Sequence, residues 1–284
     1  MATSGPGNLR ARRDFGSRLR ARRGRTPAKA VGDAIGVTAA QVTRIETGDR
    51  TCTDQMFDRF VELYGIEGQD LVDLRELLEQ ARDETPPWWY AFGEVVSANY
   101  ATVLEYEADA RLRRDYQPVL IPAHLQTEAY SREVTSLGWS ALGPDQIDSL
   151  VEVRSMRQRR LYEPKPLFVE AVITQAAVTF EVGGPEAHLE LLDHLLEITK
   201  LPNVDLRIIP YTAGAGGTHT GAFNVFSYDG GDPDVAFSEG VSGSVFMNDP
   251  RDLVRVNRLF KNLGKVALSA DDTRALIKAK RNRT

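Results

Sequence analysis

The sequence predicts two domains, an N-terminal all-α domain of five helices and a C-terminal α+β domain. The chain has 284 residues, a length that favours two domains of ordinary size. The adjacent prolines Pro86 and Pro87 exclude helix, so residues 83–87 are the expected linker. Strand-like runs begin only after Pro166, whereas helical periodicity dominates before it. We therefore expect a helical domain over residues 1–82 and an α+β domain over residues 88–284.

Five helices are expected between residues 8 and 82. In the first, Phe15 and Leu19 lie one turn apart on the same face and begin a core. Small polar residues precede the later helices, and such residues satisfy free backbone N–H groups at helix starts, whereas glycine ends helices by adopting a left-handed conformation. The expected caps are Thr26 before a helix through Ala34, Thr38 before a helix over 39–46, and Asp54 before the fourth helix, with Gly36 as a stop and 68–82 as the fifth helix.

The second domain mixes helices and strands. Residues 88–162 have mostly helical periodicity, whereas 167–173 is a β-branched apolar run typical of a buried strand. The glycine-rich run 214–217 lies between two strand-like segments and is expected to be a flexible loop. The other expected elements are helices over 185–200, 249–268 and 270–280, and strands over 204–209, 222–228 and 235–237.

Charge is divided unevenly along the chain. The formal net charge is −5, but residues 1–50 hold eleven Lys and Arg against four Asp and Glu, whereas the remaining residues hold 24 against 36. A basic end suits a polyanion, because neutralised phosphates release counterions. Cys52, the single cysteine, leaves no internal disulfide, and no run approaches the roughly 20 apolar residues that span a bilayer. We expect a cytoplasmic protein without membrane contact.

The segment 26–48 has the spacing of a helix-turn-helix. This motif needs a small residue where two helices cross, a turn glycine, an apolar residue after it, and two apolar residues on the inner face of the second helix. Those positions are Gly32, Gly36, Val37, Val42 and Ile45.

The solvent side of the second helix is small and polar, with one arginine. Such a helix suits the major groove of DNA, where arginine takes guanine O6 and N7, alanine contacts a thymine methyl, and the helix N-terminus holds a phosphate. The residues expected on that side are Ala39, Ala40, Gln41, Thr43 and Arg44.

The stretch VGDAIGVTAAQVTRIETGDR, residues 31–50, resembles the phage-repressor-like (XRE-type) helix-turn-helix regulators. Many members of that family have glutamine at the start of the first motif helix, where this chain has Ala28; Thr26, Lys29 and the arginines before them are the expected substitutes. The resemblance implies a set of DNA-facing residues, namely Thr38, Ala39, Ala40, Thr43 and Arg44, with Arg50 beside a phosphate.

The C-terminal part is similar to the C-terminal domain of actinobacterial regulators that are often encoded beside a small partner protein and are described as antitoxin-like. This resemblance implies architecture more than chemistry, and a partner protein or small molecule as the ligand of the domain. The matching segments are WWY at 88–90, LEYEA at 104–108, YQPVLIPAHLQTEAY at 116–130, RQRRL at 157–161, GGPE at 183–186 and LPNVDLRIIPYTAG at 201–214.

No set of residues has the spacing of a catalytic or metal site. His188 and His194 are six apart, and thus point in directions about 120° apart on a helix, where two ligands would need an i, i+4 spacing. We expect no metal, no cofactor and no enzymatic activity. Two alternatives stay open: an enzyme with a DNA-targeting appendage, and a protein-interaction module whose helix-turn-helix is vestigial.

A homodimer is expected, because one helix-turn-helix reads only a few base pairs and specific affinity comes from two copies about 34 Å apart. Once the core positions are assigned, residues 1–82 retain no surplus apolar stripe. The dimer contacts are therefore expected after the linker.

Overall fold

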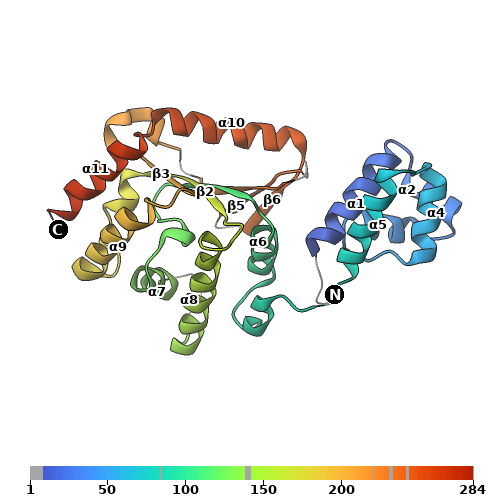
Figure 1. Ribbon diagram of the computed structural model, residues 1–284, viewed down its shortest axis with the longest axis horizontal. Helices are drawn as coiled ribbons and strands as arrows, with labels where there is room; N and C mark the ends of the chain where they lie inside the picture. The colour runs from blue at the N-terminus through green and yellow to red at the C-terminus, as the bar shows by residue number, and fades with distance from the viewer. Residues whose placement is uncertain are drawn as a thin grey trace. The chain divides into compact units, whose positions relative to one another are not determined.

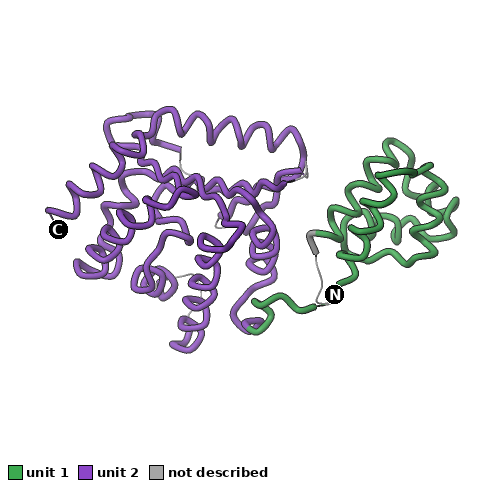
Figure 2. The backbone as a smooth tube through the Cα atoms, viewed as in Figure 1, with its two compact units in different colours: residues 1–91 green, residues 92–284 purple. Residues whose placement is uncertain are grey.

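The computed structural model describes residues 9–83, 85–137, 142–219, 221–229, 233–240 and 243–283. The chain divides into two compact units, residues 1–91 and 92–284 (Figure 2). Each unit buries apolar side chains in a core of its own. The segment expected to be a linker, 83–87, falls in the first unit, and its described residues form neither helix nor strand.

The first unit is helical, as predicted. Its core contains the fully buried side chains of Leu19, Val42, Ile45, Phe57 and Phe60. The helices are α1 (Leu9–Arg23), α2 (Ala28–Ile35), α3 (Ala39–Glu46), α4 (Asp54–Tyr64) and α5 (Gln69–Arg82), followed by a short 3₁₀ helix, η1 (Trp88–Phe92).

Two of the expected helix caps are wrong by one residue. Helix α2 is preceded by Pro27 with extended backbone and has no side-chain cap, so Thr26 lies outside the helix start. Helix α4 is capped by Thr53, whose hydroxyl accepts a hydrogen bond from the Met56 N–H, and Asp54 is its first helical residue. At the first start Thr26 is followed by a proline, and at the second start Thr53 and Asp54 can both act as caps. Spacing alone does not decide which of two neighbouring residues is the cap.

The second unit is built on one six-stranded mixed sheet. The strands have the order β3-β2-β1-β4-β5-β6, with β1, β2 and β3 parallel and the others antiparallel to their neighbours. Together with the helices around it, this sheet confirms the predicted α+β class. The strands are β1 (Leu112–Gln117), β2 (Phe168–Thr174), β3 (Val204–Ile209), β4 (Phe223–Ser227), β5 (Val235–Gly240) and β6 (Gly243–Met247).

Helices cover the two faces of this sheet unequally (Figure 1). Helices α6 (Ala98–Ala108), α7 (Glu128–Ser136), α8 (Pro144–Gln158) and α9 (Gly184–Ile198) lie on one face, where α11 (Ala270–Arg281) joins α9. Helix α10 (Pro250–Val266) lies on the other face. Four short 3₁₀ helices connect these elements: η2 (Ala123–Leu125), η3 (Arg159–Leu161), η4 (Gln175–Val178) and η5 (Tyr211–Gly217).

Strand β1 lies in a region whose periodicity predicted mostly helix, and that prediction is wrong there. Its inner face carries Arg113 and Asp115, both buried, instead of apolar side chains. Arg113 Nη2 lies 2.8 Å from Asp115 Oδ2 and Arg113 also pairs with Glu107 of α6, which accepts two hydrogen bonds of 2.7 Å from Arg157 of α8. A buried strand made of charged residues lacks the apolar run by which strands are recognised.

Two further segments differ from expectation. Strand β6 had not been predicted, because the five residues Gly243–Met247 alternate weakly between half-buried and exposed positions. The glycine-rich run 214–217 was expected to be a flexible loop, but it is the second half of η5, in which Gly214 adopts φ 56°. There, a Cβ on Gly216 would lie 3.1 Å from Val266 Cγ1, so the absence of a side chain at Gly216 allows η5 to pack on α10.

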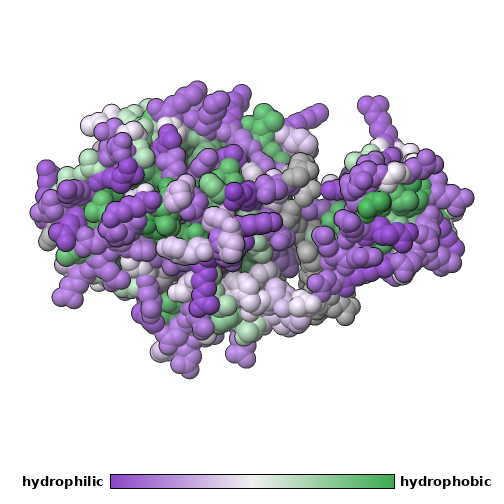
Figure 3. All heavy atoms as spheres, viewed as in Figure 1, coloured by the Kyte–Doolittle hydropathy of each residue, from purple (hydrophilic) through white to green (hydrophobic). Residues whose placement is uncertain are grey.

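Polar residues cover most of the surface seen in Figure 3, and apolar side chains reach it in separate patches. Among residues 1–82, Leu63 and Val72 are exposed large apolar side chains. The second unit exposes more of them, including Val119, Leu137, Tyr162, Phe180 and Val254. Among the described residues, no helix is long and apolar enough to cross a membrane.

Candidate nucleic-acid interface

Helices α2 and α3 cross at a point that only glycine allows. Gly36 ends α2 in the left-handed conformation with φ 72°, and its N–H bonds back to the Gly32 carbonyl. A Cβ on Gly32 would lie 2.6 Å from the Val37 carbonyl oxygen, which is too close for any side chain. The close approach therefore explains why a residue that weakens helices stands inside α2.

The start of α3 is fixed by a capping box. The Thr38 hydroxyl accepts a hydrogen bond of 3.2 Å from the Gln41 N–H, and Gln41 Oε1 accepts one of 2.9 Å from the Thr38 N–H. These bonds satisfy two of the free donors at the helix start. The side chains of Thr38 and Gln41, which were expected to face DNA, are thus hydrogen-bonded to each other at the N-terminus of α3.

The outer side of α3 is an exposed stripe. Ala40, Thr43 and Arg44 are exposed and follow each other at i, i+3 and i+4, which places them on one helix face. On the opposite side Val42 and Ile45 are fully buried. Ala39 is half-buried at the edge of the stripe. The arrangement presents one cation between small side chains, which fits the width of a DNA groove.

The end of α3 is held against α1 by a buried ion pair. Glu46, in the last turn of α3, has a side chain 1% exposed, and its two oxygens lie 2.6 and 2.9 Å from Nε and Nη2 of Arg23. The hydrogen bond with Glu46 raises the pKa of Arg23. The two helices also touch through Gly16 of α1, since a Cβ there would lie 2.3 Å from the Ile45 carbonyl oxygen. Helix α3 is therefore capped at its start and held against α1 at its end, through Ile45 and Glu46.

Three exposed cations, Arg25, Lys29 and Arg50, add to Arg44 of the stripe. All four are exposed, and none has a side-chain hydrogen bond or an ion pair within the described part of the chain. The Arg50 N–H donates a hydrogen bond of 3.1 Å to the Arg44 carbonyl, which places Arg50 at the carboxyl end of α3. Exposed cations without protein partners are available to phosphates.

Three of the arginines before Thr26 are already paired with acids. Arg20 and Arg23 contact Glu46, and Arg22 Nη2 lies 2.7 Å from Asp70. Arg23 also donates to the Thr26 carbonyl. Thr26 itself is exposed and does not cap α2. Of the residues expected to substitute for the missing glutamine, Lys29 and Arg25 are thus the two with free cationic groups among those described.

Two sequence models match the chain. The first, described as Domain of unknown function (DUF5753), matches residues 100–279. The chain belongs to this family. The second, described as Helix-turn-helix domain, matches residues 14–74, which include α2 and α3, and it indicates DNA binding by this unit. No curated protein and no solved structure matches the chain.

Three residues that support the helix-turn-helix domain were missed by sequence reasoning: Gly16, Glu46 and Arg59. Arg59 of α4 donates a hydrogen bond of 2.6 Å to the Ile35 carbonyl at the end of α2. The signal for Glu46 was present, because it lies beside Ile45 and four residues after Val42, on the buried side of α3. A carboxylate on a core face needs a partner, and the arginine-rich α1 supplies it.

In the DUF5753 domain, the titratable groups that cluster most tightly are sealed from solvent. Glu107 and His124 are 2% and 0% exposed, with 3.3 Å between Glu107 Oε1 and His124 Nε2. Burial alone would raise the pKa of Glu107, but Arg157, His124 and Arg113 outweigh it and hold that pKa well below its usual range. Burial lowers the pKa of His124. No group of three potential metal ligands occurs among the described residues.

Proposed function

We propose that this protein is a sequence-specific, XRE-type transcription regulator of the actinobacterial antitoxin-like class. It binds double-stranded DNA through α3, works in the cytoplasm as a homodimer, and receives a partner protein or a small molecule on its DUF5753 domain. The observation that carries the proposal is the exposed stripe of Ala40, Thr43 and Arg44 on a helix that is capped at its start and held against α1 at its end.

The chemistry of groove recognition assigns separate roles to the residues around α3. Arg44 reads a guanine edge, Ala39 and Ala40 contact thymine methyl groups, and Thr43 contacts a base or a nearby phosphate. The uncapped first turn of α2 presents backbone N–H groups to a phosphate between Arg25 and Lys29. Thr38 and Gln41 contribute indirectly, because their mutual bonds orient the start of α3.

We further propose that the protein has no enzymatic activity. Catalytic groups must reach a substrate, and the most strongly perturbed cluster of the DUF5753 domain, around Glu107 and His124, is closed to solvent. Its two cations, Arg113 and Arg157, balance the two anions Glu107 and Asp115. This balance supports a structural role, in which the cluster ties α6, β1 and α8 together.

Duplex binding measured against salt tests this function. Fluorescence anisotropy of a labelled duplex with the intact chain should give an affinity that falls steeply with salt, because each neutralised phosphate contributes a slope of about −0.9 in log–log form. Arg50→Ala should weaken binding to every duplex and flatten the slope by about one unit.

Arg255→Ala is the matched control, since it removes an exposed cation of α10 in the second unit and should leave binding unchanged. A vestigial motif would give weak binding in which Arg50→Ala and Arg255→Ala behave alike. That result would overturn the proposal.

A further inference from the structure

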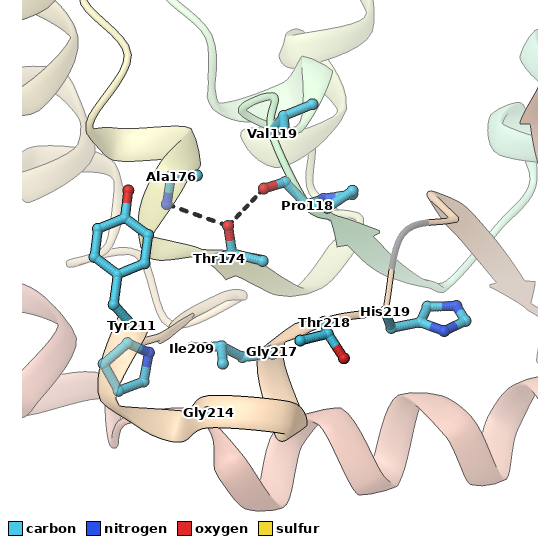
Figure 4. A pocket seen from close by; sticks show the side chains of 11 residues that line it. Pro118, Val119, Thr174, Ala176, Ile209, Tyr211, Gly214, Gly217, Thr218 and His219 are labelled. Atoms are coloured by element: carbon cyan, nitrogen blue, oxygen red, sulfur yellow. Dashed lines mark hydrogen bonds between the residues drawn. The ribbon is translucent and has the colours of Figure 1, made fainter.

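A cavity of about 510 Å³ lies where the three parallel strands of the DUF5753 domain end. Pro118 follows β1, Thr174 is the last residue of β2, and Ile209 is the last residue of β3. The 3₁₀ helices η4 and η5 continue from β2 and β3 and complete the wall (Figure 4). Ligands of open sheets with parallel strands bind outside the carboxyl ends of those strands, and the volume is in the range of small-molecule sites.

Polar groups in the wall of this cavity already have hydrogen-bond partners in the protein. The Thr174 hydroxyl donates to the Pro118 carbonyl over 2.5 Å and accepts from the Ala176 N–H over 3.2 Å. The Tyr211 N–H donates to Gln175 Oε1 over 2.9 Å. The cavity interior therefore offers a ligand mainly apolar surface.

Two side chains with unused hydrogen-bonding groups stand at opposite ends of the cavity, the Tyr211 phenol and the His219 imidazole (Figure 4). Within the described residues, neither the Tyr211 hydroxyl nor the His219 ring has a hydrogen-bond partner. The buried Tyr116 fixes the His219 position, because its hydroxyl donates to the His219 carbonyl over 2.6 Å and the two rings lie 5.6 Å apart.

Among the described residues that line the cavity, none is Asp, Glu, Lys or Arg. A charged ligand would gain no partner of opposite charge from these residues to offset the hydration it gives up on contact with them. A second cavity, of about 720 Å³ beside α10, differs in this respect, because charged residues line it, among them Arg207 and Asp205, which pair at 2.8 Å. The first cavity thus selects for an uncharged molecule.

We infer that the cavity at the ends of β1, β2 and β3 binds an uncharged aromatic or heteroaromatic small molecule, whose polar group bonds to the Tyr211 hydroxyl or to the His219 imidazole. An aromatic body suits the apolar walls and the exposed face of the Tyr211 ring. The role of this ligand as the effector of a regulator rests on the proposed function. The binding of the ligand is independent of that function, because it is measured without DNA.

Indole and two charged relatives test the inference, because they share one ring system and differ in charge: indole is neutral, indole-3-acetate is an anion and tryptamine is a cation. Saturation-transfer NMR titrations with the intact chain should give indole a dissociation constant of about 1 mM or tighter, as expected for a nine-atom ligand. Both charged relatives should bind about tenfold more weakly or not at all.

Ala176→Trp should fill the cavity and weaken indole binding about tenfold or more, whereas Ala279→Trp, at an exposed site of α11, should leave it unchanged. Tyr211→Ala, at a side chain that is 60% exposed, should also weaken it and carries little risk to folding. Equal binding by the intact chain and both cavity variants, tighter binding of a charged relative, or no binding of indole would overturn the inference. DNA binding that survives such a result leaves the proposed function intact.

Discussion

Replacing Glu46 by alanine should release the end of α3 from α1. Glu46 is buried and receives two hydrogen bonds from Arg23, whose own side chain is only 10% exposed. Removing the carboxylate leaves that guanidinium in a nearly dry place without a counter-charge. Breaking a buried pair in this way costs about 3 to 5 kcal/mol, and the residual exposure of Arg23 reduces our expectation to about 2 to 3 kcal/mol.

Hydrogen exchange of the intact chain, followed by mass spectrometry, measures this loss in the first unit alone. Peptides from α1 and α3 should exchange about 30- to 150-fold faster in Glu46→Ala, because their slowest amides report the opening of this unit. Asp70→Ala is the control, since it breaks the exposed pair with Arg22 and should cost at most about 1 kcal/mol. Equal protection in the two variants would refute the claim that Glu46 anchors α3.

Three further predictions concern packing, protonation and assembly. Gly32→Ala should destabilise the first unit by about 1 to 3 kcal/mol, although alanine has the better helix propensity. Gly264→Ala, where a Cβ meets no atom within 4 Å, should stabilise the second unit by up to about 1 kcal/mol. Urea unfolding measures both changes, and a stabilising Gly32→Ala would contradict the close crossing of α2 and α3. Burial lowers the pKa of His124, His188 and His194, so these histidines take up protons in the unfolded chain before they do so in the folded chain as pH falls. The free energy of unfolding should therefore decrease below about pH 6.5. Urea unfolding that gives the same free energy from about pH 7.5 to 5.5 would argue against this prediction. In sedimentation experiments, the intact chain should be a dimer and residues 1–82 a monomer. A dimer of the short fragment would show that the dimer contacts lie in the first unit, against the prediction.

The helix-turn-helix could be predicted because its determinants are local. Gly32, Gly36, Val42 and Ile45 lie within 14 residues of each other, and each has a distinct steric role that the structure shows directly. The apolar strands β2 and β3 were predicted within one residue for the same reason, since their residues carry the strand pattern themselves.

Strand β1 could not be predicted, because its stability depends on partners far along the chain. Arg113 and Asp115 are stable in the interior only because polar partners surround them there. Glu107 pairs with Arg113, and Asn224 donates to Asp115. Arg157 in turn donates to Glu107. Periodicity measures the apolar surface of a segment and contains no term for such distant neighbours. The same limit hid the Glu46–Arg23 pair, which joins residues 23 positions apart.

The sequence predicted which residues form the candidate interface, but not which of them are exposed and which hydrogen-bond within the protein. Ala40, Thr43 and Arg44 form the exposed stripe that the spacing indicated, whereas Thr38 and Gln41 hydrogen-bond to each other. Nor could the sequence separate free arginines from paired ones: Arg23 is engaged with Glu46, whereas Arg25 is exposed. Pairing across helices decides which cations remain for DNA.

Selection of binding sites from a randomised duplex library tests the role of α3 most directly. The intact chain should enrich two half-sites about 10 base pairs apart, centre to centre, as a dimer of helix-turn-helix domains requires. Arg44→Ala should lose about 1 to 3 kcal/mol on that site and relax the preference at one guanine in each half-site, whereas Arg255→Ala should enrich the unchanged motif. Enrichment of the same motif, guanine included, by Arg44→Ala would contradict the account, as would the absence of any enriched sequence with the intact chain.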